Sequence, residues 1–367
     1  LLQIQPIFPF FLKAKLAELE PVTREALREG FKNHYIGLAD SYNRYMESLQ
    51  ASERTFGILF CQLEYENLYN ALQICLEKHE QIEIFFYLYK YLDLINDIQS
   101  KLELSEFIYT AQAAYPQESR IGMIGLHIIM TFNCLANCYL QTKNYLKAKE
   151  LYQQLIELLR QLQNVEVILI NSNLANNYHN LGYVAQELRE YEEARSYFLQ
   201  ALDIKIEFGA KYESASTYHH LGMVAQDLRE YQQARYYFLQ ALEIYIEFGD
   251  KYEFAKTCHN LGVVAQDLRE YEQARYYFLQ ALEIYIEFDA EYESAKTYHH
   301  LGIVAQYLQE YEQVHNYFLQ ALEIFIEFGA EFDSASTYHQ LGRVAQDMHE
   351  YEQARNYYQH ALDIYIK

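Results

Sequence analysis

The stretch Tyr218-His-His-Leu-Gly-Met-Val-Ala-Gln-Asp-Leu-Arg-Glu-Tyr231, continued by Gln-Gln-Ala-Arg-Tyr-Tyr-Phe-Leu-Gln-Ala-Leu-Glu-Ile-Tyr-Ile-Glu-Phe-Gly249, decides the fold. It returns every 40 residues, as its Leu-Gly pair shows at 181–182, 221–222, 261–262, 301–302 and 341–342. Such a fixed period is the signature of stacked structural repeats. Five close copies run from about residue 171 to the end. A looser sixth copy precedes them at a spacing of 46, with Leu135, Tyr145 and Ala148 in the places of Leu181, Tyr191 and Ala194.

Each unit predicts two antiparallel helices, the first over Ser214–Asp227 and the second over Tyr231–Phe248. Apolar residues of the second helix recur at intervals of three and four, which indicates one buried face. The short Leu-Arg-Glu link makes the helices neighbours. Glycine after the second helix (Gly209, Gly249, Gly329, replaced once by Asp289) suits a left-handed C-cap. We expect Gly222 to face Ala234, so that the two backbones approach closely, and Ala241 to face the next unit.

The pattern of Tyr218, Leu221, Gly222, Tyr231, Ala234, Phe238 and Ala241 resembles the tetratricopeptide repeat. The resemblance implies an all-α fold, a right-handed α-α superhelix, whose concave groove binds a protein or an extended peptide. The unit is longer than the common repeat of ~34 residues. Ala225 stands where the family usually has a larger residue, and Ile246 stands where it often has proline.

The first 120 residues predict helices without a regular repeat, over Glu25–Leu49, Ser52–Glu77, Gln81–Gln99 and Leu102–Ala114. Three stretches resemble signal-transduction NTPases with numerous domains (the STAND class), cyanobacterial members above all. Phe31–Ala39 resembles the helix after their winged-helix domain, and Leu63–Leu72 resembles the linker before their repeats. Gln3–Phe8 resembles the last strand of the winged helix. The expected organisation is therefore a domain remnant at 1–22, a helical arm at 23–120, a degenerate repeat at 121–170 and five units at 171–367.

No G-x-x-x-x-G-K-[ST] phosphate loop occurs in the sequence. The resemblance therefore implies the ligand-sensing region of a STAND NTPase, with the NTPase module as an intramolecular partner that lies outside this chain. The alternative is a free-standing adaptor. Because residue 1 is Leu and the last repeat stops within its second helix, we expect a piece of a longer protein or self-association through the last helix pair.

Charge, apolar content and cysteine usage limit the classes of partner and the compartment that we expect for this protein. The formal net charge of −22 disfavours nucleic acid, which a cationic surface would bind. No signal peptide is visible in this sequence, and no apolar run approaches ~18–20 residues, so we expect no membrane span. The chain has five cysteines, an odd number, and their spacings match no zinc signature. A reducing cytoplasm fits this pattern best. Cys134 and Cys138, four apart on one helical face, are interpreted as small core residues.

Histidine and glutamine recur at fixed positions of the first helix, seven residues apart and thus on one face. A metal site is disfavoured, because equivalent residues of adjacent units lie roughly 20 Å apart and one His with one Gln supplies too few ligands. Three interpretations stay open: hydrogen bonding to a neighbouring helix, a by-product of repeat duplication, and a polar ladder that contacts a partner. An enzyme using the histidines is a further alternative, but no nucleophile–base pair is visible. We expect no catalysis and no cofactor.

Positions that vary between units are more informative than the constant ones. They predict a groove with an apolar floor, Lys256 and Lys296 in its middle and Arg343 at one end, suited to an extended segment with acidic groups. Neutral drift is the alternative. The remaining charges are interpreted as a solvated outer surface. The candidate groove residues are His179, Tyr183, Gln186, Ser216, His219, Met223, Gln226, Lys256, His259, Val263, Gln266, Lys296, His299, Ile303, Gln306, Tyr307, His339, Arg343 and Gln346.

Overall fold

A computed structural model describes residues 18–116, 122–162 and 165–366. Within these ranges the protein has 16 helices, α2 to α17, and no strand, which confirms the predicted all-α fold. The chain forms two compact units, residues 1–180 and 181–367. The strand expected at Gln3–Phe8, like most of the remnant expected at 1–22, lies outside the described residues. The other predicted domain boundaries stay predictions.

The arm consists of four helices, α2 (Pro21–Met46), α3 (Ala51–Glu77), α4 (Glu83–Leu94) and α5 (Ile98–Gln112). One apolar core joins them, in which Leu68, Leu72 and Phe85 are fully buried. The helix predicted over Gln81–Gln99 is wrong at both ends. It ends at Leu94 because Asn96 adopts a left-handed conformation (φ 56°), and the Asp97 carboxylate then caps α5 by accepting from the Ser100 amide at 3.0 Å.

The degenerate sixth repeat is formed by α6 (Gly122–Gln141) and α7 (Tyr145–Gln161), and α8 (Val167–Glu187) follows. The spacing of 46 between this repeat and the next, six residues more than the regular 40, arises from a longer helix and a longer connection. Helix α8 has 21 residues where the later first helices have 17. The connection before it, between Gln161 and Val167, is two residues longer than the one between α9 and α10.

Among the described residues one helix, α6, is long and apolar enough to cross a membrane, with 20 residues and a mean hydropathy of 1.4 in its most apolar window. This corrects the expectation that no run of that length exists. The helix is also part of the protein interior, since 56% of that window is buried and Ile128 belongs to the core of the arm. A core helix of this composition is weak support for a membrane span.

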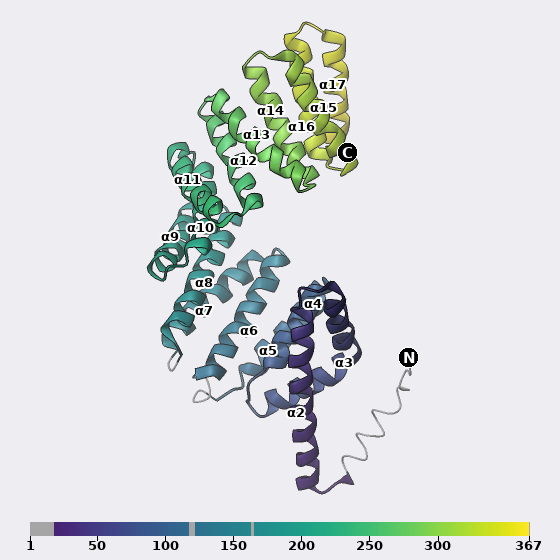
Figure 1. Cartoon of the computed structure of the whole chain (residues 1–367), viewed down its shortest axis with the longest axis vertical. Coiled ribbons are helices and arrows are strands. Elements are labelled where there is room, and N and C mark those ends of the chain that lie inside the picture. Colours follow the sequence, from purple (N-terminus) through teal and green to yellow (C-terminus); the bar gives the residue numbers. More distant parts are fainter. Residues whose placement is uncertain (1–17, 117–121, 163–164, 367) are drawn as a thin grey trace. The chain divides into compact units, whose positions relative to one another are not determined.

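The regular array follows as successive antiparallel helix pairs (Figure 1). Helix α10 starts three residues before the predicted Ser214, at Lys211, with Ala210 at its N-cap. The second helix has the predicted bounds in α11. The elements are α9 (Tyr191–Glu207), α10 (Lys211–Asp227), α11 (Tyr231–Phe248), α12 (Lys251–Asp267), α13 (Tyr271–Glu287), α14 (Glu291–Tyr307), α15 (Tyr311–Glu327), α16 (Glu331–Asp347) and α17 (Tyr351–Ile366).

A glycine–aromatic contact closes each helix pair. A Cβ placed on Gly222 would lie 2.6 Å from ring atoms of Phe238, and the same holds at 2.6 Å for Gly302 and Phe318. The expectation that Gly222 faces Ala234 is therefore wrong in its partner, because the buried ring of Phe238 fills that space. Ala241 packs with Ala215 of its own unit and with Phe254 of the next.

Left-handed residues end the helices at both turns of a unit. Gly209, Gly249 and Gly329 have φ of 69°, 71° and 63°, and Asp289 has φ of 50°, which confirms the predicted caps. The turn within each unit was not predicted to be left-handed, because it carries no glycine. There the residues with positive φ are Arg189, Arg229, Arg269, Gln309 and His349.

Ion pairs between adjacent units lie beside these turns. Arg195 contacts Glu230 at 2.5 Å and Arg275 contacts Glu310 at 2.8 Å, while Arg235 pairs with Glu270. Several of these charges therefore also connect neighbouring units. Partly exposed pairs of this kind contribute about 0.2–1 kcal/mol each, so apolar packing remains the main source of stability.

Gly222→Ala should lower the free energy of unfolding by about 1–3 kcal/mol, because the added methyl group overpacks against Phe238. Gly37→Ala is the matched control: Gly37 lies inside helix α2, and a Cβ there meets nothing within 4 Å. That substitution should raise stability by about 0.5–1 kcal/mol through helix propensity. Urea unfolding followed by circular dichroism measures both, and equal effects of the two substitutions would contradict the packing explanation.

Candidate functional site

The first helices of adjacent units form one surface of the array. Helix α10 contacts α12, α12 contacts α14 and α14 contacts α16, whereas successive second helices make fewer contacts with one another. The array is therefore tighter on the side of the first helices, which we call the inner face. The predicted groove residues of unit 181–367 all lie on these first helices.

The histidine column connects neighbouring first helices. His219, His259 and His299 place Nδ1 at 3.0, 3.0 and 2.9 Å from a threonine hydroxyl of the next unit, in Thr257, Thr297 and Thr337 respectively. Each of these hydroxyls donates its only proton to the carbonyl four residues earlier, at 2.8 Å. The histidine Nδ1 must therefore carry the proton and donate it.

The other ring nitrogen of His219 accepts from the Asn260 amide at 3.1 Å, which completes the hydrogen bonding of a neutral imidazole. Burial is the main cause that lowers the pKa of His219 to about 3 and those of His259 and His299 to about 4. These bonds agree with the interpretation in which the histidines bond a neighbouring helix. His179 is half-buried, and His339 in the last unit is exposed.

The glutamine ladder also bonds across units, but it is interrupted. Gln186 donates to Asp227 at 3.3 Å, and Gln306 donates to Asp347 at 3.0 Å. At the corresponding junction of Gln266, residue 307 is tyrosine instead of aspartate, and Gln266 bonds His300 at 3.2 Å. Gln226 is half-buried, and Gln346 accepts from Tyr358 within its own unit at 3.1 Å.

Tyr307, which replaces the aspartate of the glutamine ladder, makes an aromatic contact at the inner face. Its ring stacks on Tyr271, with centroids 4.5 Å apart and planes 7° apart, while 55% of the residue stays exposed. The sequence singled out Tyr307 but not Tyr271, which begins the second helix of the preceding unit. Tyr271 is half-buried against the core, so the pair offers the exposed ring of Tyr307 for apolar contact.

The apolar floor is narrower than predicted. Tyr183, Met223, Val263 and Ile303 are half-buried and pack against the cores between units, and only Arg343 of this position is exposed. The side chains that the inner face exposes to solvent are therefore mainly polar. Ser216 is half-buried. The ammonium of Lys256 lies 2.8 Å from Glu253, and that of Lys296 lies 4.4 Å from the centre of the Tyr292 ring.

One buried lysine was missed because only its departure from the repeat marks it. Lys205 occupies the position of Tyr245, Tyr285 and Phe325 in later units and is 6% exposed. Its ammonium donates to the Thr217 hydroxyl at 2.9 Å and to the Glu213 carbonyl at 3.0 Å. Burial lowers its pKa to about 8. The side chain thereby joins α9 to α10.

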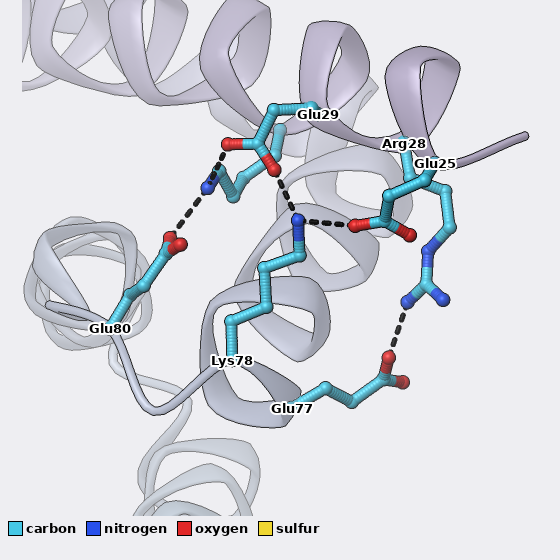
Figure 2. Close-up of polar contacts among 7 residues, drawn as sticks. Glu25, Arg28, Glu29, Glu77, Lys78 and Glu80 are labelled. Atoms are coloured by element: carbon cyan, nitrogen blue, oxygen red, sulfur yellow. Dashed lines mark hydrogen bonds and ion pairs between the residues drawn. The ribbon is translucent and has the colours of Figure 1, made fainter. Parts of the chain in front are cut away.

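In the arm, the two stretches that resemble STAND proteins lie on α2 and α3 and contact each other. Tyr35 donates to Glu64 at 3.1 Å, and burial followed by this bond raises the pKa of Tyr35 to about 12. Farther along, Figure 2 shows an ion-pair network that joins the start of α2 to the end of α3. Its members are Glu25, Arg28, Glu29, Lys32, Glu77, Lys78 and Glu80.

Lys32 lies at the buried end of this network. Its side chain is 4% exposed and its ammonium lies 2.5 Å from Glu80. Burial opposes the charge of Lys32, but its hydrogen bonds to Glu29 and Glu80 outweigh that effect and raise its pKa. The two helices are thus connected both in their middle and at one end.

Side chains that could carry out chemistry are dispersed. No group of three or more His, Cys, Asp or Glu side chains close enough to hold a metal ion occurs in the described ranges. The five cysteines are unpaired, and burial raises the pKa of Cys61 and Cys258 to about 12. Cys138 is fully buried beside Ser105 and Tyr89, in agreement with its interpretation as a small core residue.

Acid should weaken the array through its histidines. The imidazoles have pKa values near 4 or below in the folded protein and about 6.5 when unfolded. The unfolded state therefore binds more protons between these values, so stability is complete above pH ~6.5 and falls as the pH drops toward ~4, by up to about 3 kcal/mol per imidazole. Urea unfolding across this range measures it. The triple variant His219→Gln, His259→Gln, His299→Gln should have a flatter profile, and an unchanged slope would contradict the assignment.

Comparison with known proteins places the repeats in a family. Sequence models described as tetratricopeptide repeat match residues 133–160, 173–247, 253–327 and 334–367, together more than half of the chain. The degenerate sixth repeat is included, as the sequence predicted. No curated protein matches the chain.

Solved structures share the fold at low sequence identity. The apo form of RapI is 17% identical, with a TM-score of 0.60 over 77% of this chain and 96% of that one. BtubC from P. vanneervenii is 19% identical, with a TM-score of 0.52 over 64% and 91%. A STAND protein with a tetratricopeptide repeat sensor from Pyrococcus horikoshii is 17% identical, with a TM-score of 0.54 over 83% of this chain and 49% of that one. The helix pairs, their glycine–aromatic contacts and the family matches lead to one conclusion: the chain belongs to the tetratricopeptide repeat proteins.

Proposed function

We propose that the inner face binds an extended, acidic segment of a partner protein. The observation that carries this proposal is the set of unit-specific residues Lys256, Lys296, Tyr307 and Arg343 within an otherwise constant ladder. The protein has a net charge of −22, so the three cations Lys256, Lys296 and Arg343 stand out among its many acidic residues. They provide a complementary site for carboxylates, and the Tyr271–Tyr307 pair provides apolar contact beside them.

The local partners of the two lysines do not prevent such binding. The pair between Lys256 and Glu253 joins residues three apart on one helix, and the side chains are 42% and 31% exposed. Pairs of this kind are weak, so a carboxylate of the partner exchanges for Glu253 at little cost. Lys296 is exposed and lies over an aromatic ring, which leaves its ammonium accessible to an anion.

Removing the two lysines should weaken binding of an acidic probe. Lys256→Gln with Lys296→Gln is expected to raise the Kd of a fluorescein-labelled peptide of repeating Glu-Leu-Ser by about 2- to 20-fold at low salt. Fluorescence anisotropy measures it. The control, Arg229→Gln with Arg269→Gln, removes the same charge from the exposed turns and should change the Kd by less than about 2-fold. Equal losses in both variants would mean that net charge alone attracts the peptide.

We propose further that the chain is the ligand-sensing region of a STAND-type NTPase that works in the cytoplasm. The resemblance of Phe31–Ala39 and Leu63–Leu72 supports this role, and the contact between Tyr35 and Glu64 joins the two stretches. The fold similarity to the Pyrococcus horikoshii protein supports it at the level of architecture, and this chain spans about half of that protein. A ligand on the inner face would then change the position of the arm relative to the NTPase module.

The complete gene product tests this role. A phosphate loop encoded before Leu1, together with ATP hydrolysis that rises when the acidic probe peptide is added, is the expected result. The Lys256→Gln, Lys296→Gln variant should hydrolyse ATP at the basal rate without that rise. A gene product that lacks a phosphate loop would instead favour the free-standing adaptor.

Self-association is a second candidate interaction, favoured by an exposed apolar face of the last helix. Leu362 of α17 is 49% exposed, whereas Leu322 at the same position of the preceding unit is 6% exposed. Tyr351 is also largely exposed, and an open hollow of about 360 Å³ lies between these residues. A second copy of the chain could cover this face as the following unit covers it elsewhere in the array.

A further inference from the structure

A row of large apolar side chains lies exposed where the second helices end. The same tripeptide, Ile-Glu-Phe, closes α9, α11, α13 and α15, and its isoleucines are 55–61% exposed while its phenylalanines are 39–53% exposed. We call this row the end ridge. It comprises Ile206, Phe208, Ile246, Phe248, Ile286, Phe288, Ile326 and Phe328.

Tyrosines of the first helices join the ridge into a continuous surface. The ring of Phe248 lies 5.4 Å from that of Tyr212, and the ring of Phe288 lies 5.9 Å from that of Tyr252. All four rings line one open groove of about 630 Å³, which therefore spans two units. The next unit repeats the contact, with 6.0 Å between Tyr292 and Phe328.

The ridge is not part of the cores between units. The buried residues of the second helices are other ones, such as Phe278, Ala281 and Tyr285 in α13. A contiguous exposed apolar row of this length is uncommon on a soluble protein and is characteristic of an interaction surface.

The charge beside the ridge changes along the array, and this indicates what binds there. Lys211 pairs with Glu247 at 2.5 Å and Lys251 pairs with Glu287 at 2.6 Å, each joining the start of a first helix to the end of the second. In the next unit the lysine position is Glu291, so Glu291 and Glu327 take the places of the ion pair. The cation that neutralises the earlier units is replaced by a second acid.

A further acid appears at the same place. Asp289 replaces the glycine of the other units and adopts a left-handed conformation with φ of 50°. Glycine adopts this conformation without strain, whereas aspartate does so at some cost. Phe288 is consequently surrounded in sequence by Glu287, Asp289, Glu291 and Glu293, of which only Glu287 has an ion-pair partner described above.

We propose that the end ridge between Phe288 and Phe328 binds a basic, apolar segment of a partner protein. A lysine or arginine of the partner takes the place that Lys211 and Lys251 fill in the earlier units, between Glu291 and Glu327. Its apolar side chains cover Phe288, Ile326 and Phe328. The site is separate from Lys256 and Lys296 on the inner face, and its acidity repels an anionic lipid surface.

A fluorescein-labelled peptide of repeating Lys-Leu-Ser tests the proposal by anisotropy at low salt. Phe288→Ser with Phe328→Ser should raise its Kd by about tenfold or more. The matched control, Tyr236→Ser with Tyr276→Ser, removes two aromatics of similar exposure, 52% and 60%, from the outer face of the same kind of helix and should leave the Kd unchanged within about 2-fold.

Charge variants distinguish recognition from unfolding. Glu291→Lys restores the ion pair of the earlier units, so it should keep or raise stability and yet raise the Kd by about 2- to 5-fold. Lys251→Glu extends the acidic stretch and should lower the Kd by a similar factor. Asp289→Gly should raise the melting temperature and weaken binding together.

Three results would overturn the proposal: a Kd that follows net charge alone in all these variants, equal loss in the tyrosine control, or binding to anionic phosphatidylserine vesicles in preference to the peptide. The inner-face variant Lys256→Gln, Lys296→Gln should bind the Lys-Leu-Ser peptide no more weakly than the unmodified protein does. This keeps a failure of the ridge distinct from a failure of the inner face.

Discussion

The contact between a glycine of the first helix and an aromatic ring of the second determines the geometry of the array. Because a Cβ on Gly222 would lie 2.6 Å from the ring of Phe238, the first helix can rest on that ring only where it has no side chain. The ring is fully buried there and contributes to the core shared with the next unit. The first helix carries both this glycine and the histidine that reaches the threonine of the following unit, so the contact helps to position that histidine.

Much of this architecture could be predicted from the sequence, because a pattern that recurs in five units with few changes shows the same structure several times. The helix pairs, the glycine caps and the weak sixth repeat follow from spacing alone. The partner of Gly222 could not be predicted, since periodicity defines which residues share a face but not which side chain fills the gap. The left-handed Arg229 carries no sequence signal either, because arginine is not typical of that conformation.

The candidate site was predictable in part. Lys256, Lys296 and Tyr307 were found because they depart from a constant background, and the same comparison would have revealed Lys205 in a column of aromatics. The threonine partners of the histidines recur with the same period of 40, so both residues of each pair were visible in the sequence. That they bond each other could not be predicted, because the bond depends on the distance between adjacent first helices. The half-buried state of Met223 and Val263 could not be predicted, because it depends on how tightly neighbouring first helices pack.

The bond between histidine and threonine has a consequence for how the array behaves as a whole. Each link joins a unit only to its neighbour, so the units resemble a one-dimensional chain in which the state of one member biases the next. When one unit is stabilised, the effect therefore extends over a limited number of neighbouring units. A partner that binds two units and stabilises them would therefore also reduce local unfolding in neighbouring units that it does not touch.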